Sequence, residues 1–64
     1  MDQDLEKAAL WLVGSKVTDL SEVFDKLIIK AINDRGEEIE VTLTDHAMGG
    51  IYCKSLSVNN KQLI

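Results

Sequence analysis

The chain has 64 residues, a net charge of −4, one cysteine, one histidine and no proline. This length allows a single domain, and a core of this size rarely contributes more than about 3–5 kcal/mol to stability without a disulfide, a metal or a second chain. One cysteine excludes an internal disulfide, and no Cys/His cluster offers a zinc site. We therefore expect residues 1–64 to form one small domain that gains stability by association.

The distribution of charge indicates which partners to expect. All eleven carboxylates lie within residues 1–45, whereas residues 46–64 carry only Lys54 and Lys61. No basic stripe that could pair with phosphates is visible, so direct nucleic-acid binding is not expected. The first residues are acidic where a secretory signal would be basic, and the longest apolar run, residues 8–13, is far shorter than the ~20 residues of a membrane span. A cytoplasmic protein without membrane contact is the expectation.

Residues 2–13 have the pattern of an amphipathic helix. Two carboxylates, Asp2 and Asp4, lie in or before the first turn, where they favour the positive end of the helix dipole. Gly14 follows the last apolar residue, as a left-handed C-terminal cap requires. The apolar stripe repeats at i, i+3, i+4, i+7 and i+8, and it consists of Leu5, Ala8, Ala9, Leu12 and Val13.

Residues 19–32 also fit a helix, after a short connector at residues 15–18. Asp19 and Glu22 have the spacing of a capping box at the start of this segment. Six apolar residues then match the helical template at every expected position, namely Leu20, Val23, Phe24, Leu27, Ile28 and Ala31. A helix is the favoured interpretation, and it gives the chain two N-terminal helices.

The alternative for the end of this segment is the first strand of a β-hairpin. The sequence NDRG at residues 33–36 suits a type I turn with its glycine in the left-handed region. Ile28, Ile29 and Ile32 are β-branched and favour a strand. Residues 27–32 nevertheless show no alternation of apolar and polar side chains, so the hairpin stays open as the second interpretation.

Two strands are expected in the C-terminal half of the chain. Residues 37–44 alternate between apolar and polar side chains, so one face of this strand is buried and the other faces water. Residues 51–58 form a second strand, whose imperfect alternation requires a bulge near residues 54–55. The pair Asn59-Asn60 resembles a tight turn, which would allow residues 61–64 to add a short third strand.

These elements predict an α+β fold. Two helices pack on a small antiparallel sheet in the order ααββ, with the short third strand in addition and with a second copy completing the sheet or the helices. The alternative is one helix followed by a small antiparallel barrel or meander. Its strands would cover residues 27–33, 37–44, 50–58 and 61–64.

Several apolar side chains lie outside the predicted buried stripes and indicate a contact surface. At ~100° per residue they point away from the core face of their helix, and they are Leu10, Trp11, Ile29 and Ile32. Tryptophan is enriched among residues that dominate binding energy, and exposed apolar patches mark interaction sites. We expect a homodimer with Leu10 and Trp11 near the centre of its interface. The alternative is a wider core that buries all four side chains.

Carboxylates form a second expected surface. Glu38 and Glu40 share one face of their strand. Together with Asp34 and Asp45 they would present negative charge to a basic protein partner, and complementary charge would speed the encounter. The simpler alternative is a sheet face that faces water.

Candidate chemistry is sparse. His46 and Cys53 are the only side chains that commonly serve as a nucleophile, a base or a soft metal ligand. Nucleophilic catalysis requires a base within hydrogen-bonding distance and a third group that orients the base, and the sequence has no second histidine. We therefore expect no enzyme activity, no cofactor and no metal site, with Cys53 a small buried side chain. His46 and Met48 are instead candidate contact residues in the connection between the two strands.

The function that these patterns favour is that of a small non-enzymatic protein-interaction module. It would act as an adaptor, inhibitor or regulator through an apolar helix surface and an acidic face. Compact acidic chains of this size are common among phage-encoded and bacterial accessory proteins. The alternative, a small regulator that binds RNA or peptides, follows from the barrel fold by analogy only.

Overall fold

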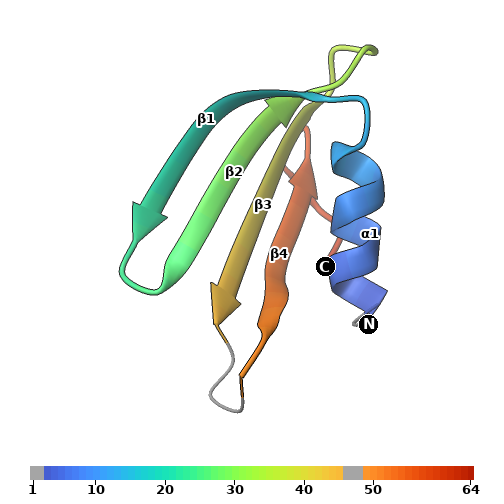
Figure 1. Ribbon diagram of the computed structural model, residues 1–64. Coiled ribbons are helices and arrows are strands. Elements are labelled where there is room, and N and C mark those ends of the chain that lie inside the picture. The colour runs from blue at the N-terminus through green and yellow to red at the C-terminus, as the bar shows by residue number, and fades with distance from the viewer. Residues whose placement is uncertain (1–2, 46–48) are drawn as a thin grey trace.

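The computed structural model describes residues 3–45 and 49–64, and in this part of the chain one helix precedes a five-stranded antiparallel sheet (Figure 1). The elements are α1 (Gln3–Leu12), β1 (Lys16–Val23), β2 (Lys26–Ile32), β3 (Glu38–Asp45), β4 (Ile51–Val58) and β5 (Lys61–Gln62). Each strand pairs with the next one along the chain, so the sheet order is β1-β2-β3-β4-β5. The fold is α+β, and the alternative prediction of one helix followed by a meander fits it.

The first predicted helix is confirmed as α1. The backbone leaves the helix at Gly14, whose φ of +79° is the left-handed conformation expected for its cap. The amide of Ser15 donates a hydrogen bond of 3.0 Å to the carbonyl of Leu12, and the Ser15 hydroxyl donates another of 2.6 Å to the same oxygen. The last turn of the helix is therefore closed by the residues that follow it.

The predicted second helix over residues 19–32 is wrong, because this segment forms β1 and β2. Val23 pairs with Lys26 across a two-residue turn, and the two strands run antiparallel from there. The inner face of β2, which faces α1, carries Leu27, Ile29 and Ala31; these residues lie opposite Leu43, Val41 and Ile39 of β3. The alternation is hidden in the sequence because the outer face of β2 also carries isoleucines. Pairing with β3, whose apolar and polar residues alternate, favours a strand over a helix for residues 26–32. Strand preference depends on the neighbouring residues across the sheet.

The NDRG segment is the β2–β3 turn. The amide of Gly36 donates a hydrogen bond of 3.0 Å to the carbonyl of Asn33, as in a type I turn. Gly36 has a φ of +77°, which glycine adopts without the strain that a side chain would bring. The turn interpretation of this sequence is therefore confirmed in its hairpin form.

The C-terminal predictions hold in detail. Thr42 lies opposite Ser55, whereas Leu43 lies opposite Cys53, so Lys54 is the extra residue of a bulge in β4. Asn59 and Asn60 both have positive φ, 52° and 66°, which is the conformation of a type I′ hairpin turn. The third predicted strand is present as the two residues of β5.

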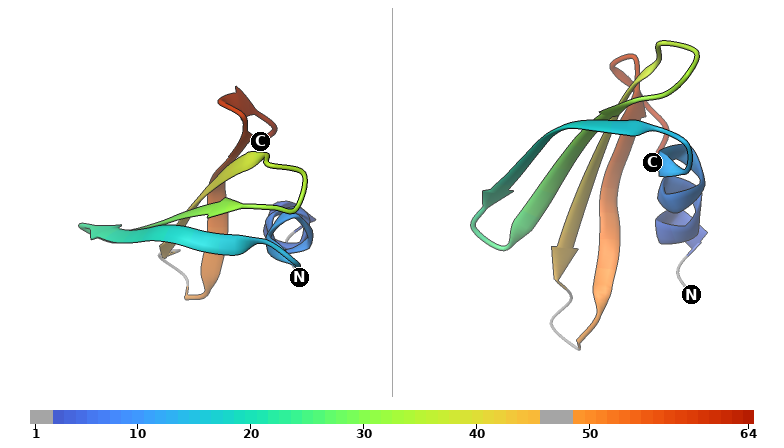
Figure 2. Two further views of the ribbon diagram at one scale, coloured as in Figure 1. Left: turned by 90° about the horizontal axis from the view of Figure 1, so that it is seen from above. Right: turned by 45° about the horizontal axis from the view of Figure 1, so that its top comes forward.

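The core lies between α1 and the inner face of the sheet. Helix α1 packs against β4 and β3 (Figure 1), with Ala8 as its buried residue. The other buried apolar residues are Ala31, Ile39, Val41, Cys53, Leu56 and Val58. The β1–β2 hairpin extends away from the helix, as both views in Figure 2 show. The molecule measures 37 × 23 × 19 Å along its principal axes, and this elongation leaves part of the inner face uncovered.

Candidate functional site

The helix covers only part of the inner face of the sheet. A helix of 10 residues is about 15 Å long and 10–12 Å wide with its side chains. Strands of 8 residues, such as β1, β3 and β4, are about 26 Å long and lie about 4.8 Å apart. One short helix therefore cannot shield four long strands.

The uncovered part of the inner face is apolar, and we refer to it as the open end. It comprises Leu20, Phe24, Leu27, Leu43 and Ile51. Leu20 and Ile51 are 60% and 61% exposed, whereas Leu27 and Leu43 are half-buried. Burying large apolar side chains is more favourable than leaving them exposed to water. The open end is therefore the expected place for contact with another apolar surface.

A hollow of ≈400 Å³ lies within the open end. Its apolar walls are Phe24, Leu27, Leu43 and Ile51, and its rim carries Glu22, Asp25, Lys26, Thr44 and Asp45. Thr44 is buried, and its hydroxyl donates a long hydrogen bond of 3.4 Å to the carbonyl of Asp25. This contact ties the tip of the β1–β2 hairpin to β3 and joins two residues of the rim.

Phe24 occupies an unusual position at the tip of that hairpin. Its side chain is 97% exposed, and its φ is +57°. In two-residue hairpins with positive φ at the first central position, that residue is usually glycine. A bulky residue with positive φ is an outlier that costs about 1–2 kcal/mol. An aromatic side chain at this place gives the isolated chain neither burial nor a relaxed backbone.

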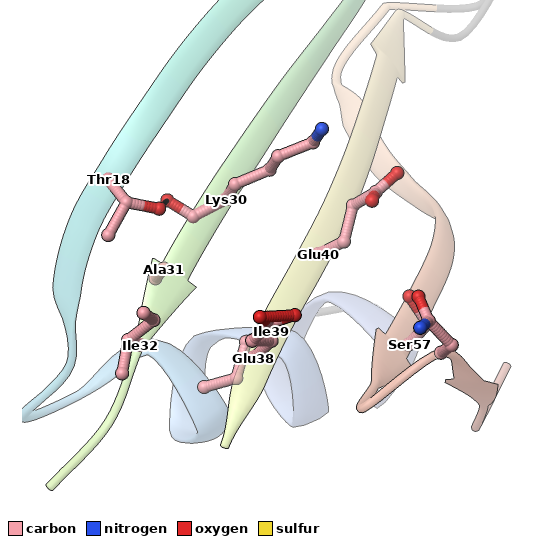
Figure 3. A pocket seen from close by; sticks show the side chains of 9 residues that line it. Thr18, Lys30, Ala31, Ile32, Glu38, Ile39, Glu40 and Ser57 are labelled. Atoms are coloured by element: carbon pink, nitrogen blue, oxygen red, sulfur yellow. Dashed lines mark hydrogen bonds between the residues drawn. The ribbon is translucent and has the colours of Figure 1, made fainter. Parts of the chain in front are cut away.

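The outer face of the sheet carries charged and hydroxyl side chains together with the isoleucines of β2. Lys30 lies opposite Glu40 across β2 and β3, and Figure 3 shows both side chains extending from these neighbouring strands beside a hollow of ≈230 Å³. Glu38 also lines this hollow, so two members of the predicted acidic face do lie together. Asp34 lies instead in the β2–β3 turn and Asp45 at the end of β3. The structure thus gathers only part of the acidic set, with a lysine opposite it.

Two lysines meet near the open end. A hydrogen bond with Lys54 and repulsion from its ammonium group lower the pKa of Lys26. Desolvation lowers this pKa by a smaller amount, whereas the charges of Asp25 and Tyr52 raise it. Lys54 is the bulge residue of β4, and Lys26 lies on the rim of the hollow next to Asp25.

Replacing Lys54 with methionine is expected to raise the pKa of Lys26 towards its ordinary value, because both dominant causes of the lowering disappear. The measurement is an NMR titration of the lysine side-chain resonances. The control is Lys30→Met on the outer face, which leaves the pair intact and should leave the titration of Lys26 as it is. If Lys26 titrated identically with and without Lys54, the two amines would not be in contact.

The predicted apolar interface residues lie in three places. Leu10 is 70% exposed on α1, and Trp11 is half-buried against the core. These two line a third hollow, of ≈290 Å³, together with Val13 and the β2–β3 turn. Ile29 packs against the core from the inner face, while Ile32 lies on the outer face. The helix surface predicted from sequence is therefore reduced to Leu10 and its neighbours.

No family model, no curated protein and no solved structure matches the chain. The surfaces of the molecule itself therefore indicate what it can bind. Helical spacing assigns Leu20, Phe24 and Leu27 to a buried stripe, which is why the open end is missed from sequence. The apolar residues on both sides of Phe24-Asp25 are the only sequence feature that could have indicated a hairpin with an apolar tip at this place.

The described residues offer little reactive chemistry. Cys53 is buried in the core, and its thiol donates a hydrogen bond of 3.3 Å to the carbonyl of Ser55. Among residues 3–45 and 49–64, no three His, Cys, Asp or Glu side chains are grouped so that they could hold a metal ion. The same residues contain no helix with the length and apolar character of a membrane span. His46 and Met48, the predicted loop contacts, lie outside the described part.

Proposed function

We propose that the chain is a small non-enzymatic protein-interaction module that binds a protein partner through the open end of its sheet. The observation that carries this proposal is the fully exposed Phe24 beside an apolar hollow. Aromatic anchors and the pockets that receive them dominate the binding energy of protein interfaces. An adaptor, an inhibitor or a regulator acts in this way.

The composition of the hollow supports binding over catalysis. Its walls are aliphatic and aromatic, while its acidic groups, Glu22, Asp25 and Asp45, are exposed at the rim. Catalytic acids and bases are usually held in place by burial and by close partners, whereas these three carboxylates are exposed. Rim charges around an apolar centre are the usual arrangement of a protein interface.

The shape of the molecule gives independent support. The radius of gyration is 11.4 Å, compared with about 10.7 Å for a compact domain of this length. The extra extension comes from the β1–β2 hairpin, which projects from the body of the molecule (Figure 2). A projecting hairpin with an apolar tip can reach into a partner without moving the core.

A photo-crosslinking amino acid in place of Phe24 tests this proposal in cells of the source organism. We expect crosslinks to one defined protein, identified by mass spectrometry, because position 24 would lie within the interface. The same amino acid at Leu10, an exposed position on the helix, is the matched control and should not capture that protein. Equal capture from both positions, or none from position 24, would count against the open end.

The second candidate is a peptide-binding function by strand addition. β1 pairs on one side only, with β2, so its other edge offers backbone groups to an extended peptide. The edge also carries Lys16, Asp19 and Glu22, and charges of this kind usually protect an edge from pairing. Hydrogen exchange separates the two candidates, because only strand addition would newly protect the edge amides of β1. RNA binding has less support, since the outer face sets Glu38 and Glu40 beside its lysine.

A further inference from the structure

We infer that the open end binds a second copy of this chain, with Phe24 of each copy seated in the hollow of the other about a two-fold axis. This inference rests on the proposed function, because it names the partner of the same surface. It commits to self-association through the hairpin tip and not through the helix surface around Leu10.

The open end contains both halves of a contact. Phe24 projects from the tip, and the apolar hollow that could receive such a ring lies directly beside it. In a two-fold dimer the same patch of both copies meets, so a projection next to a cavity is complementary to itself. The hollow of ≈400 Å³ is within the size range of pockets that hold small ligands.

The backbone at the tip is strained at Phe24. Phe24 holds a φ of +57°, a conformation that glycine adopts freely and that a bulky side chain resists. Strain of this kind persists where function requires it. The isolated chain gains nothing from the aromatic ring, which is 97% exposed. A partner that buries the ring supplies the missing stabilisation.

The amount of exposed surface also indicates a missing partner. The chain exposes 4680 Å² with a mass of 7.1 kDa, whereas a compact monomer of this mass exposes about 4,100 Å². The excess of about 600 Å² approaches the ~800 Å² that each partner contributes to a stable interface. Covering the open end would therefore bring the exposed surface close to that of an ordinary compact protein.

Charge at the tip is also compatible with a two-fold contact. Asp25 and Lys26 are adjacent at the end of the hairpin, next to Phe24. When two tips cross in opposite directions, the acid of one copy can face the base of the other. This arrangement offsets part of the repulsion between two chains that each carry a net charge of −4.

Sedimentation equilibrium of the full chain and of Phe24→Gly tests the inference. We expect the wild type to dimerise and the variant to have a Kd at least about 30-fold higher, because a central aromatic anchor is lost. Glycine relieves the strain at this φ, so the variant should fold and its monomer should melt at an unchanged or higher temperature. The matched control is Leu10→Ala, which removes an exposed side chain from the helix and should leave the Kd within threefold of wild type.

A second variant provides a complementation test. Ile51→Lys places a charge in the wall of the hollow at an exposed position, so this variant should also fail to dimerise. A mixture of Phe24→Gly and Ile51→Lys should associate, because the ring of the second variant can still enter the hollow of the first, which keeps Leu27, Leu43 and Ile51 as its walls. Association of the mixture with a Kd below that of either variant alone supports the inference.

A wild-type chain that stays monomeric, or a Phe24→Gly chain that dimerises as well as wild type, would overturn the inference. If such a monomer still crosslinked from position 24 to a different protein, self-association would be wrong and the proposed function would stand. If the chain neither dimerised nor crosslinked from position 24, the self-association and the proposed function would both be wrong. A dimer weakened by Leu10→Ala and not by Phe24→Gly would move the interface to the helix.

Discussion

A chain with alanine in place of Leu56 is expected to be largely unfolded at 25 °C. Leu56 is 0% exposed and lies opposite Val41 at the centre of the inner face. Replacing a buried leucine with alanine costs about 2–5 kcal/mol, through lost apolar burial and the cavity that remains. A core of this size contributes only about 3–5 kcal/mol in total. The loss therefore removes most or all of the stability, which far-UV circular dichroism in a urea titration measures.

The control for this prediction makes the same chemical change on the surface. Leu10→Ala removes a side chain that is 70% exposed, and alanine keeps a high helix propensity at that position. We expect its free energy of unfolding to stay within about 0.5 kcal/mol of wild type. If the two substitutions destabilised the chain equally, the core would not be centred on β4. Both measurements belong at low protein concentration, where association adds little to stability.

Asn33→Ala is expected to lower the free energy of unfolding by about 2 kcal/mol, since several hydrogen bonds worth about 1 kcal/mol each are lost. The Oδ1 of Asn33 accepts hydrogen bonds from the amides of Arg35 and Glu37, at 3.0 and 2.9 Å. Its Nδ2 donates to Oε1 of Glu37 at 2.8 Å. This one side chain thus organises the β2–β3 turn, which sets the register of the two central strands. Urea denaturation of both chains gives the difference.

Asn33→Asp is the matched variant for the turn. Aspartate keeps an oxygen for the two amide donors, but it loses the donation to Glu37 and places a like charge beside that carboxylate. Its loss of stability should therefore lie between zero and that of the alanine variant. An alanine variant as stable as wild type would show that the backbone hydrogen bonds of the turn, without the side chain, are sufficient.

The sequence predicts those elements whose signals are local. Gly14 follows the last turn of helix α1, β3 alternates without interruption, and the bulge at Lys54 follows from the broken alternation of β4. The hairpin of β1 and β2 carries weaker signals. Its turn has Phe24 where glycine or asparagine is usual, and a register shift at Thr18 interrupts β1. The apolar residues of two strands joined in this way reproduce the spacing of a helix by coincidence.

The open end could not be predicted from pattern alone, because it results from a mismatch between elements. How far the inner face extends beyond α1 depends on the lengths of the helix and the strands and on their packing. Trp11 illustrates the same limit. Its angular position on the helix indicates an outward side chain, yet the helix is rotated so that Trp11 packs partly against the core. Rotation of a helix on a sheet is a tertiary property.

The meander order of the sheet has a consequence for how the chain reaches its native state. Every strand neighbours in space the strand that neighbours it in sequence, and the β1–β2 and β4–β5 turns contain two residues each. Local pairing of this kind requires little loop closure, and low contact order speeds the search for the native arrangement. The hairpins can therefore form one after another. Helix α1 packs against β4, which is far from it in the sequence, so this contact closes a loop of nearly the whole chain. We therefore expect closure of the core to be the late step of folding.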